Sequence, residues 1–180
     1  MRELISIHHF ADVRGLLGVE PGINAVFFEA SNTQSFSDPG ARAAFRERWL
    51  GHYLTHYPEW AYVAMNSDKS VAGYLVASLD DPASTPRFSD IHYFATFKDL
   101  THRFPAHLHV NLASGSRGAG IGTALMARFV ADARRAGVPG VHIVTSRGAR
   151  NVGFYTRNGF HEAGAMGEGT SEVVFLAREL

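Results

Sequence analysis

The stretch HLHVNLASGSRGAGIG, residues 107–122, decides how this chain folds. Apolar and polar residues alternate over 107–112, which predicts a β-strand with one apolar and one polar face. A glycine-rich turn follows. From Ile121 to Ala133 apolar residues then recur every three or four positions, which predicts a helix that ends near Gly137. The order is therefore strand, glycine loop and helix.

The glycine-rich turn favours binding of a phosphate or pyrophosphate group. Glycines allow backbone N–H groups to approach a ligand closely, and the N-terminus of a helix adds a partial positive charge. A P-loop is excluded because Thr123, and no lysine, follows Gly122. A dinucleotide-binding fingerprint that begins at Gly118 would need a third glycine where Thr123 stands.

The remaining pattern, Arg-x-x-Gly-x-Gly, fits Arg117, Gly120 and Gly122. It resembles the acetyl-CoA motif of the GNAT superfamily of N-acetyltransferases. The segment FYTRNGF at 154–160 is similar to a second signature of that family, F-Y-x-x-x-G-F. Two motifs in the right order are more specific than either alone, and the similarity extends from Trp60 to Leu180.

The chain departs from the family pattern at one position, and one of its segments is also similar to a further group of domains. The family commonly carries an asparagine seven residues before the tyrosine, where this chain has Gly148, whereas Asn151 lies four residues before it. The segment FPAHLHVNL, residues 104–112, is also similar to bacterial relatives of the acetyltransferase-like domain of O-GlcNAc hydrolases. Some of those domains look like acetyltransferases without activity.

The resemblance implies an α/β (α+β) fold, with a mixed, mostly antiparallel central sheet flanked by helices, in a single domain spanning residues 1–180. It implies acetyl-CoA as cosubstrate and direct acetyl transfer to an amine. The backbone N–H of Leu112 would meet the thioester oxygen, and the loop 117–123 would take the pyrophosphate. The implied cofactor-binding residues are Asn111, Leu112, Ala113, Arg117, Gly118, Ala119, Gly120, Ile121, Gly122, Thr123 and Asn151.

Three residues are candidates for proton transfer. Tyr155 matches the tyrosine that protonates the leaving sulfur in many family members, and a phenol of pKa ~10 is protonated at neutral pH. The alternative is an ordinary packing tyrosine. His107 and His109 share one strand face and could accept a proton directly or through water. They could equally be structural donors, and an acceptor amine that arrives neutral needs no base.

Composition narrows the class of protein. The 180 residues suit one domain, and 17 basic against 17 acidic residues give no field that attracts nucleic acid or a membrane surface. The chain has no cysteine, which excludes disulfides and thiolate metal sites. The histidine pairs 107/109 and 52/56 supply two ligands each, so no metal site is expected. Without a signal-like or transmembrane segment, a cytoplasmic location is the default expectation.

The sequence outside these motifs predicts several short strands and helices. A first strand is expected over 4–8 and a helix or turn over 11–19. A helix capped by Asp38 begins at Pro39 and ends near His56. Further expectations are a hairpin (60–65 and 71–77), a partly helical stretch (89–102) that either covers the acceptor side or completes a core, and a last strand (172–176) beside 160–163.

Two functional classes follow. The first is an acetyl-CoA-dependent N-acetyltransferase that acts on an amine of a small molecule or a protein. The second is a non-catalytic acyl-CoA-binding module, in which the glycine loop is kept but transfer is absent. Homodimers are common among similar proteins, and the sequence leaves that state open.

Overall fold

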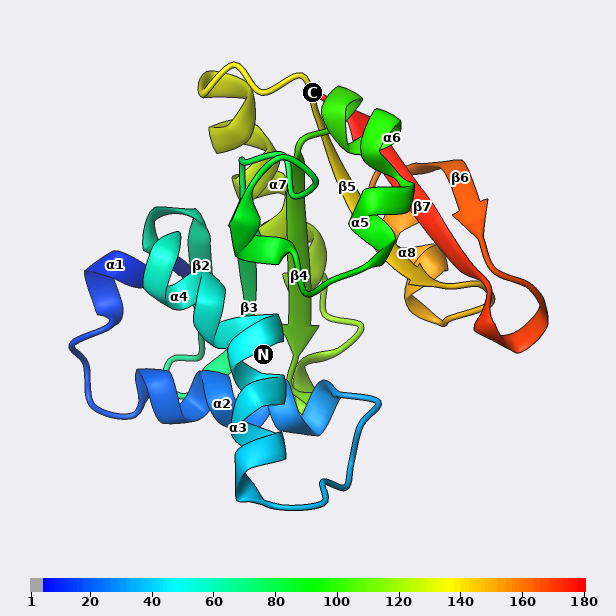
Figure 1. The fold of residues 1–180 in the computed structure, drawn as a ribbon. Helices are drawn as coiled ribbons and strands as arrows, with labels where there is room; N and C mark the ends of the chain where they lie inside the picture. The colour runs from blue at the N-terminus through cyan, green and yellow to red at the C-terminus, as the bar shows by residue number, and fades with distance from the viewer. Residues whose placement is uncertain (1–4) are drawn as a thin grey trace. The chain divides into compact units, whose positions relative to one another are not determined.

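The computed structural model describes residues 5–180 (Figure 1). The chain divides into two compact units. The first holds the residues up to Ala77 together with His109–Phe129, and the second holds Ser78–Leu108 with Val130–Leu180. Strand β4 (Ala106–Leu112) and helix α7 (Ile121–Arg135) each pass from one unit into the other. The single domain expected over residues 1–180 stays a prediction.

Seven strands pair in the order β1-β2-β3-β4-β5-β7-β6. The pairing of β4 with β5 is parallel, whereas β1 with β2, β2 with β3, β5 with β7, and β6 with β7 are antiparallel. This confirms the mixed, mostly antiparallel sheet expected from the sequence. The other strands are β1 (Ser6–His9), β2 (Ala61–Met65), β3 (Val71–Ser78), β5 (Gly140–Ser146), β6 (His161–Met166) and β7 (Val173–Glu179).

The first unit carries the N-terminal helices, which are drawn in blue and cyan in Figure 1. They are α1 (Phe10–Val13), α2 (Val19–Ala30), α3 (Pro39–Arg46) and α4 (His52–His56), with a π-helical turn at Glu47–Gly51 between α3 and α4. The Asp38 carboxylate accepts a hydrogen bond of 2.9 Å from the N–H of Ala41, which confirms the predicted cap.

The start of the chain contains one expected strand and one helix that the sequence pattern did not predict. The first strand spans Ser6–His9, which covers the expected range from Ser6 to His8, and Leu4 lies outside the described residues. Helix α2 was not expected. Its buried residues Val19, Ile23, Val26 and Phe27 follow helical spacing, but Pro21 and Gly22 in the first turn obscure the pattern.

The second unit holds the segment between β3 and β4, which contains α5 (Tyr93–Thr96) and α6 (Lys98–Arg103). The expected partial helicity is confirmed. Phe88, Phe94, Phe97 and Phe104 are all buried, so the aromatic residues of this segment complete a core. Phe97 and Phe104 pack against Phe175 of β7.

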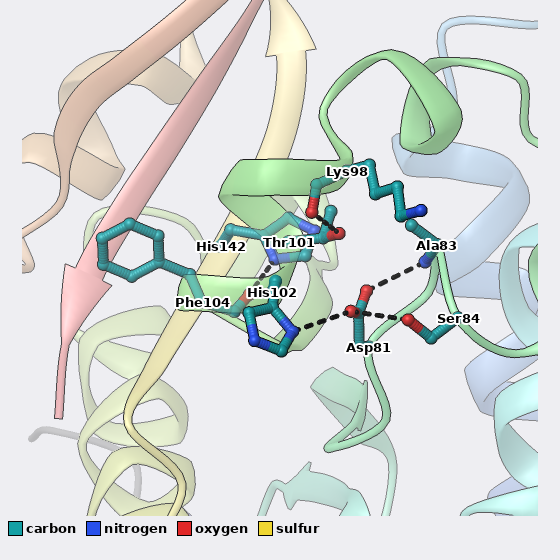
Figure 2. Close-up of polar contacts among 8 residues, drawn as sticks. All are labelled: Asp81, Ala83, Ser84, Lys98, Thr101, His102, Phe104 and His142. Carbon is teal, nitrogen blue, oxygen red and sulfur yellow. Dashed lines mark hydrogen bonds and ion pairs between the residues drawn. The ribbon is translucent and has the colours of Figure 1, made fainter.

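Figure 2 shows the polar contacts of this segment within the second unit. The Asp81 carboxylate accepts hydrogen bonds from the Ala83 N–H at 3.0 Å and the Ser84 hydroxyl at 2.9 Å, and it lies 3.9 Å from Nδ1 of His102. The fully buried His142 of β5 contacts the carbonyl oxygen of Phe104 through Nδ1. The turn that follows β3 is thereby tied to α6, and the end of α6 to β5.

The C-terminal part of the second unit contains helix α8 (Asn151–Arg157) and the antiparallel pair β6 and β7. Arg147, at the end of β5, pairs with Glu162 at 2.7 Å and with Glu172 at 2.7 Å. The last strand pairs with β6 as predicted, although both strands extend beyond the expected ranges. Among residues 5–180, no helix has the length and apolar character that a membrane span requires.

Candidate functional site

The end of β4 lies beside β3, and the register of the two strands shows which of their residues are opposite each other. Within the first unit, the N–H of Ala113 donates to the carbonyl oxygen of Ala72 at 3.0 Å. One residue further along β3, Gly73 lies against the main chain of Asn111 and Leu112. Because the numbers rise on one strand as they fall on the other, the two strands run antiparallel here.

This register fixes the direction of the Leu112 amide. In an antiparallel pair, hydrogen-bonded positions alternate with positions whose N–H and C=O groups point to the opposite edge. Ala113 opposite Ala72 is a hydrogen-bonded position, so Leu112 opposite Gly73 is not. The N–H of Leu112 therefore points away from β3.

The loop after β4 presents open backbone. Gly118 and Gly120 have φ of 78° and 84°, which L side chains rarely adopt, and no atom lies within 4 Å of a β-carbon placed on either one. Residues Arg117, Gly118, Ala119 and Gly120 are all exposed. Alternation of left-handed glycines with an ordinary residue turns successive N–H groups into a concave anion-binding surface.

The first turn of α7 continues this surface. Its first intrahelical bond runs from the N–H of Ala124 to the carbonyl of Gly120 at 3.0 Å. The N–H groups of Ile121, Gly122 and Thr123 precede that bond and lie at the positive end of a long helix. The loop and helix start thus suit a pyrophosphate, which is the anionic group of acetyl-CoA nearest to its pantetheine arm.

Glu29 of α2 holds the start of the same loop through a contact that no sequence motif predicts. The Glu29 carboxylate accepts a hydrogen bond of 3.1 Å from the N–H of Ser114. Hydrogen bonds from the side chain and backbone of Ser114, with the positive charge of Arg117, keep the pKa of Glu29 below its usual range. Glu29 therefore anchors the chain two residues after Leu112.

His109 lies in an aromatic setting within the first unit. Its Nε2 is 3.3 Å from the hydroxyl of Tyr53, and its ring meets the rings of Trp49 and Tyr53 edge to face. Burial lowers the pKa of His109 to about 4, so the imidazole is neutral at physiological pH. Trp49 comes from the π-helical turn, a feature often found at functional sites.

The other polar residues of β4 have defined surroundings. Asn111 donates from its amide nitrogen to the hydroxyl of Tyr74 at 2.7 Å, which is consistent with the register derived above. His107 is 3% exposed and belongs to the second unit, where its ring packs against Phe88 and Phe94. This is the environment of a core histidine, and we propose no proton transfer for it.

Tyr155 lies on α8 in the second unit and is 4% exposed. Its ring packs edge to face on Phe154 and Phe160. No group among residues 5–180 forms a hydrogen bond with its hydroxyl, and burial raises its pKa. The phenol therefore stays protonated throughout the physiological range.

Asn151 begins α8, where its side-chain oxygen accepts a hydrogen bond of 3.0 Å from the hydroxyl of Thr145. Asn151 is exposed and joins the end of β5 to the start of α8. For a metal, the described residues offer no group of three or more histidine or carboxylate side chains in a suitable arrangement.

A model of the acetyltransferase (GNAT) family matches residues 27–160, which include β4, the glycine loop, α7 and Tyr155. The chain belongs to the GNAT acetyltransferase family. The structure titled SsHAT is similar over 97% of this chain and 98% of its own, with 21% identity and a TM-score of 0.73. A GCN5-related N-acetyltransferase from Kribbella flavida is similar over 98% of each chain, with 18% identity and a TM-score of 0.66.

The GNAT fold uses acetyl-CoA as cosubstrate, and a third similar structure, the NatC complex bound to a Gag peptide and CoA, contains CoA. That likeness covers 98% of each chain at 16% identity, with a TM-score of 0.61. The loop from Arg117 to Thr123 leaves space beside Gly118 and Gly120, where such a ligand could approach the backbone. The family assignment also agrees with the parallel pairing of β4 and β5.

Sequence reasoning identified the glycine loop and missed the groups that support it. Glu29, Trp49, Tyr53 and Tyr74 carry no motif, and their partners are far away in the sequence. The contact between Tyr74 and Asn111 depends on the register of β3 against β4, which the sequence pattern does not specify. No sequence signal points to Glu29.

Proposed function

We propose that this GNAT protein is an N-acetyltransferase, which transfers the acetyl group of acetyl-CoA directly to an amine nitrogen. The acceptor is an amine of a small molecule or of a protein. The observation that carries the proposal is the continuous backbone run from the outward-pointing N–H of Leu112 to the open glycines Gly118 and Gly120. Bound acetyl-CoA supplies a thioester, whose carbonyl carbon is attacked by the amine.

In this proposal, the N–H of Leu112 donates to the thioester carbonyl oxygen. Charge grows on that oxygen as the amine attacks, and a donor that is already oriented stabilises it without reorganisation. The hydrogen bond between Ala113 and Ala72, with the close contact of Gly73, holds the Leu112 amide in place. Arg117 and the N–H groups of residues 118–123 bind the pyrophosphate.

Tyr155 is proposed as the general acid that protonates the leaving thiolate when the carbon–sulfur bond breaks. The phenolate regains a proton, through solvent, from the nitrogen that has formed the new carbon–nitrogen bond. Its raised pKa keeps the proton on the phenol until a stronger base is formed nearby. Since the hydroxyl has no hydrogen-bond partner among residues 5–180, it is available for an incoming group. The aromatic contacts with Phe154 and Phe160 fix the ring.

His109 is proposed to position the amine rather than to deprotonate it. An imidazole of pKa about 4 is a poor acceptor for the proton of an alkylammonium group of pKa ~10. A neutral imidazole bound to Tyr53 instead offers a fixed hydrogen-bonding nitrogen on the polar face of β4. The amine therefore loses its proton to solvent before it attacks.

The proposal is tested by incubating the protein with acetyl-CoA and a panel of amines at alkaline pH, while CoA release and the mass of each amine are followed. An acetylated amine, formed in step with CoA, is the expected result. Binding of acetyl-CoA without CoA release from any amine, including lysine peptides and protein N-termini, would instead indicate a non-catalytic acyl-CoA-binding module.

A further inference from the structure

A pocket of about 570 Å³ lies in the first unit, between the end of α2 and the start of α3. Phe28, Phe36, Asp38 and Arg42 are among the residues that line it. The volume is within the range of small-molecule sites. Neither the glycine loop nor Tyr155 contributes to this pocket.

Arg42 is the charged group in the pocket that is available to a ligand. Its guanidinium carbon lies over the Phe28 ring, 3.5 Å from the ring centre, in a cation–π contact. No carboxylate among residues 5–180 forms an ion pair with it. A guanidinium in such a contact still presents N–H groups that can bind a carboxylate through two hydrogen bonds.

Three other polar side chains of the pocket, Gln34, Ser37 and Asp38, already have partners. One carboxylate oxygen of Asp38 accepts from the N–H of Ala41 at 2.9 Å, and the other accepts from the Ser37 hydroxyl at 2.9 Å. The amide nitrogen of Gln34 donates to the carbonyl oxygens of Phe28 and Ser31. Asp38 stays ionised, since these bonds lower its pKa, but its charge serves the cap of α3.

Aromatic rings form the apolar part of the pocket and hold it in shape. Phe28 and Phe36 meet edge to face, with ring centres 6.2 Å apart. Phe36 in turn packs on Phe45 of α3 at 5.3 Å, and Phe45 packs on Phe27 of α2 at 5.5 Å. A ligand that fits therefore combines a carboxylate with an aromatic or large apolar group.

We propose that this pocket binds the carboxylate and side group of the acetyl acceptor, which is an amino acid or similar amine with an aromatic or large apolar side group. This inference rests on the proposed N-acetyltransferase function. Phe28 is the neighbour of Glu29, whose carboxylate holds Ser114 just after Leu112. Helix α2 therefore connects the pocket to the strand end where the thioester carbonyl would bind.

The first test measures binding without catalysis. Calorimetric titration with 3-phenylpropionate, which has the carboxylate and ring but no amine, is expected to show binding to the wild-type protein. Arg42→Gln should weaken it at least tenfold, because a charged hydrogen-bonding pair is lost. The control Arg14→Gln changes another arginine that lies near a ring, 5.8 Å from Phe10, and should leave binding unchanged.

The second test compares acetylation of L-phenylalanine with that of L-phenylalaninamide. The ratio of the kcat/KM for phenylalanine to that for the amide is expected to fall at least tenfold in Arg42→Gln, because only phenylalanine has the carboxylate that Arg42 binds. An unchanged ratio, or equal binding of 3-phenylpropionate by Arg42→Gln, overturns the inference. If the wild-type protein neither binds acetyl-CoA nor acetylates any amine, the proposed function itself is contradicted.

Discussion

Gly73 of β3 lies so close to Asn111 of β4 that a β-carbon at position 73 would be 2.8 Å from the Asn111 carbonyl oxygen. It would also meet the Leu112 side chain and lie 3.3 Å from the Leu112 α-carbon. The close approach of the two strands therefore requires glycine here. The same contact sets the position of the Leu112 amide.

Gly73→Ala should lower the free energy of unfolding by about 1–3 kcal/mol, because one strand must shift to accept the added methyl group. Acetyl transfer should fall more than stability explains, since the Leu112 N–H moves with the strand. Chemical denaturation and initial rates of CoA release test this. Gly15→Ala, where no atom lies within 4 Å of the added carbon, is the control. Full activity in a destabilised Gly73→Ala protein would contradict the role of Leu112.

Tyr155→Phe removes the proposed proton donor and keeps the ring contacts with Phe154 and Phe160. Turnover should fall by about 100-fold or more, which is typical for loss of a general acid, while the Kd of acetyl-CoA stays the same. Tyr93→Phe is a matched control, because burial raises the pKa of Tyr93 as well. If both variants turn over at the wild-type rate, Tyr155 is a packing residue.

The pH dependence of kcat/KM should follow the acceptor. His109 has a pKa of about 4 and is neutral across the assay range, so no histidine inflection is expected between pH 6 and 7. The rate should rise tenfold per pH unit up to the pKa of the amine itself. The raised pKa of Tyr155 predicts no loss at moderately alkaline pH. An inflection near pH 6.5 that stays the same for amines of different pKa would indicate a histidine base.

The lowered pKa of His109 also makes stability depend on pH. The pKa of this histidine is near 6.5 in the unfolded state and about 4 in the folded state. Between these two pH values the unfolded state is protonated at His109 and the folded state is not. His109 therefore destabilises the fold progressively as pH falls from about 6.5 to 4. His109→Gln should reduce the loss of free energy of unfolding between pH 7 and 5 by an amount on the order of 1 kcal/mol, which is measured as a smaller fall in melting temperature. Parallel melting curves for both proteins would show that His109 is solvated.

The sequence was informative where a local pattern is sufficient. Alternation over 107–112 and the glycine spacing after it identify β4, the loop and the start of α7, because both features arise from neighbouring residues. The cap at Asp38 and the hairpin of β2 and β3 are local in the same way. These elements are enough to indicate the family that the chain belongs to.

What could not be predicted depends on contacts between distant residues. Glu29 reaches Ser114 across 85 positions, and His109 meets Tyr53 across 56. His107 and His109 look alike on one strand face, yet His107 packs in an aromatic core while His109 lies beside Tyr53. Only tertiary packing distinguishes them.

Binding of acetyl-CoA to the glycine loop tests the account most directly. At ~100 times its Kd, acetyl-CoA should stabilise the protein by about 2.7 kcal/mol, a rise in melting temperature of about 5–10 °C for a chain of this size. Gly120→Val should abolish the rise. Gly137→Val should keep it, because Gly137 has a similar φ of 76° and open space but lies at the other end of α7. An equal rise in both variants, or none in the wild type, would contradict the account.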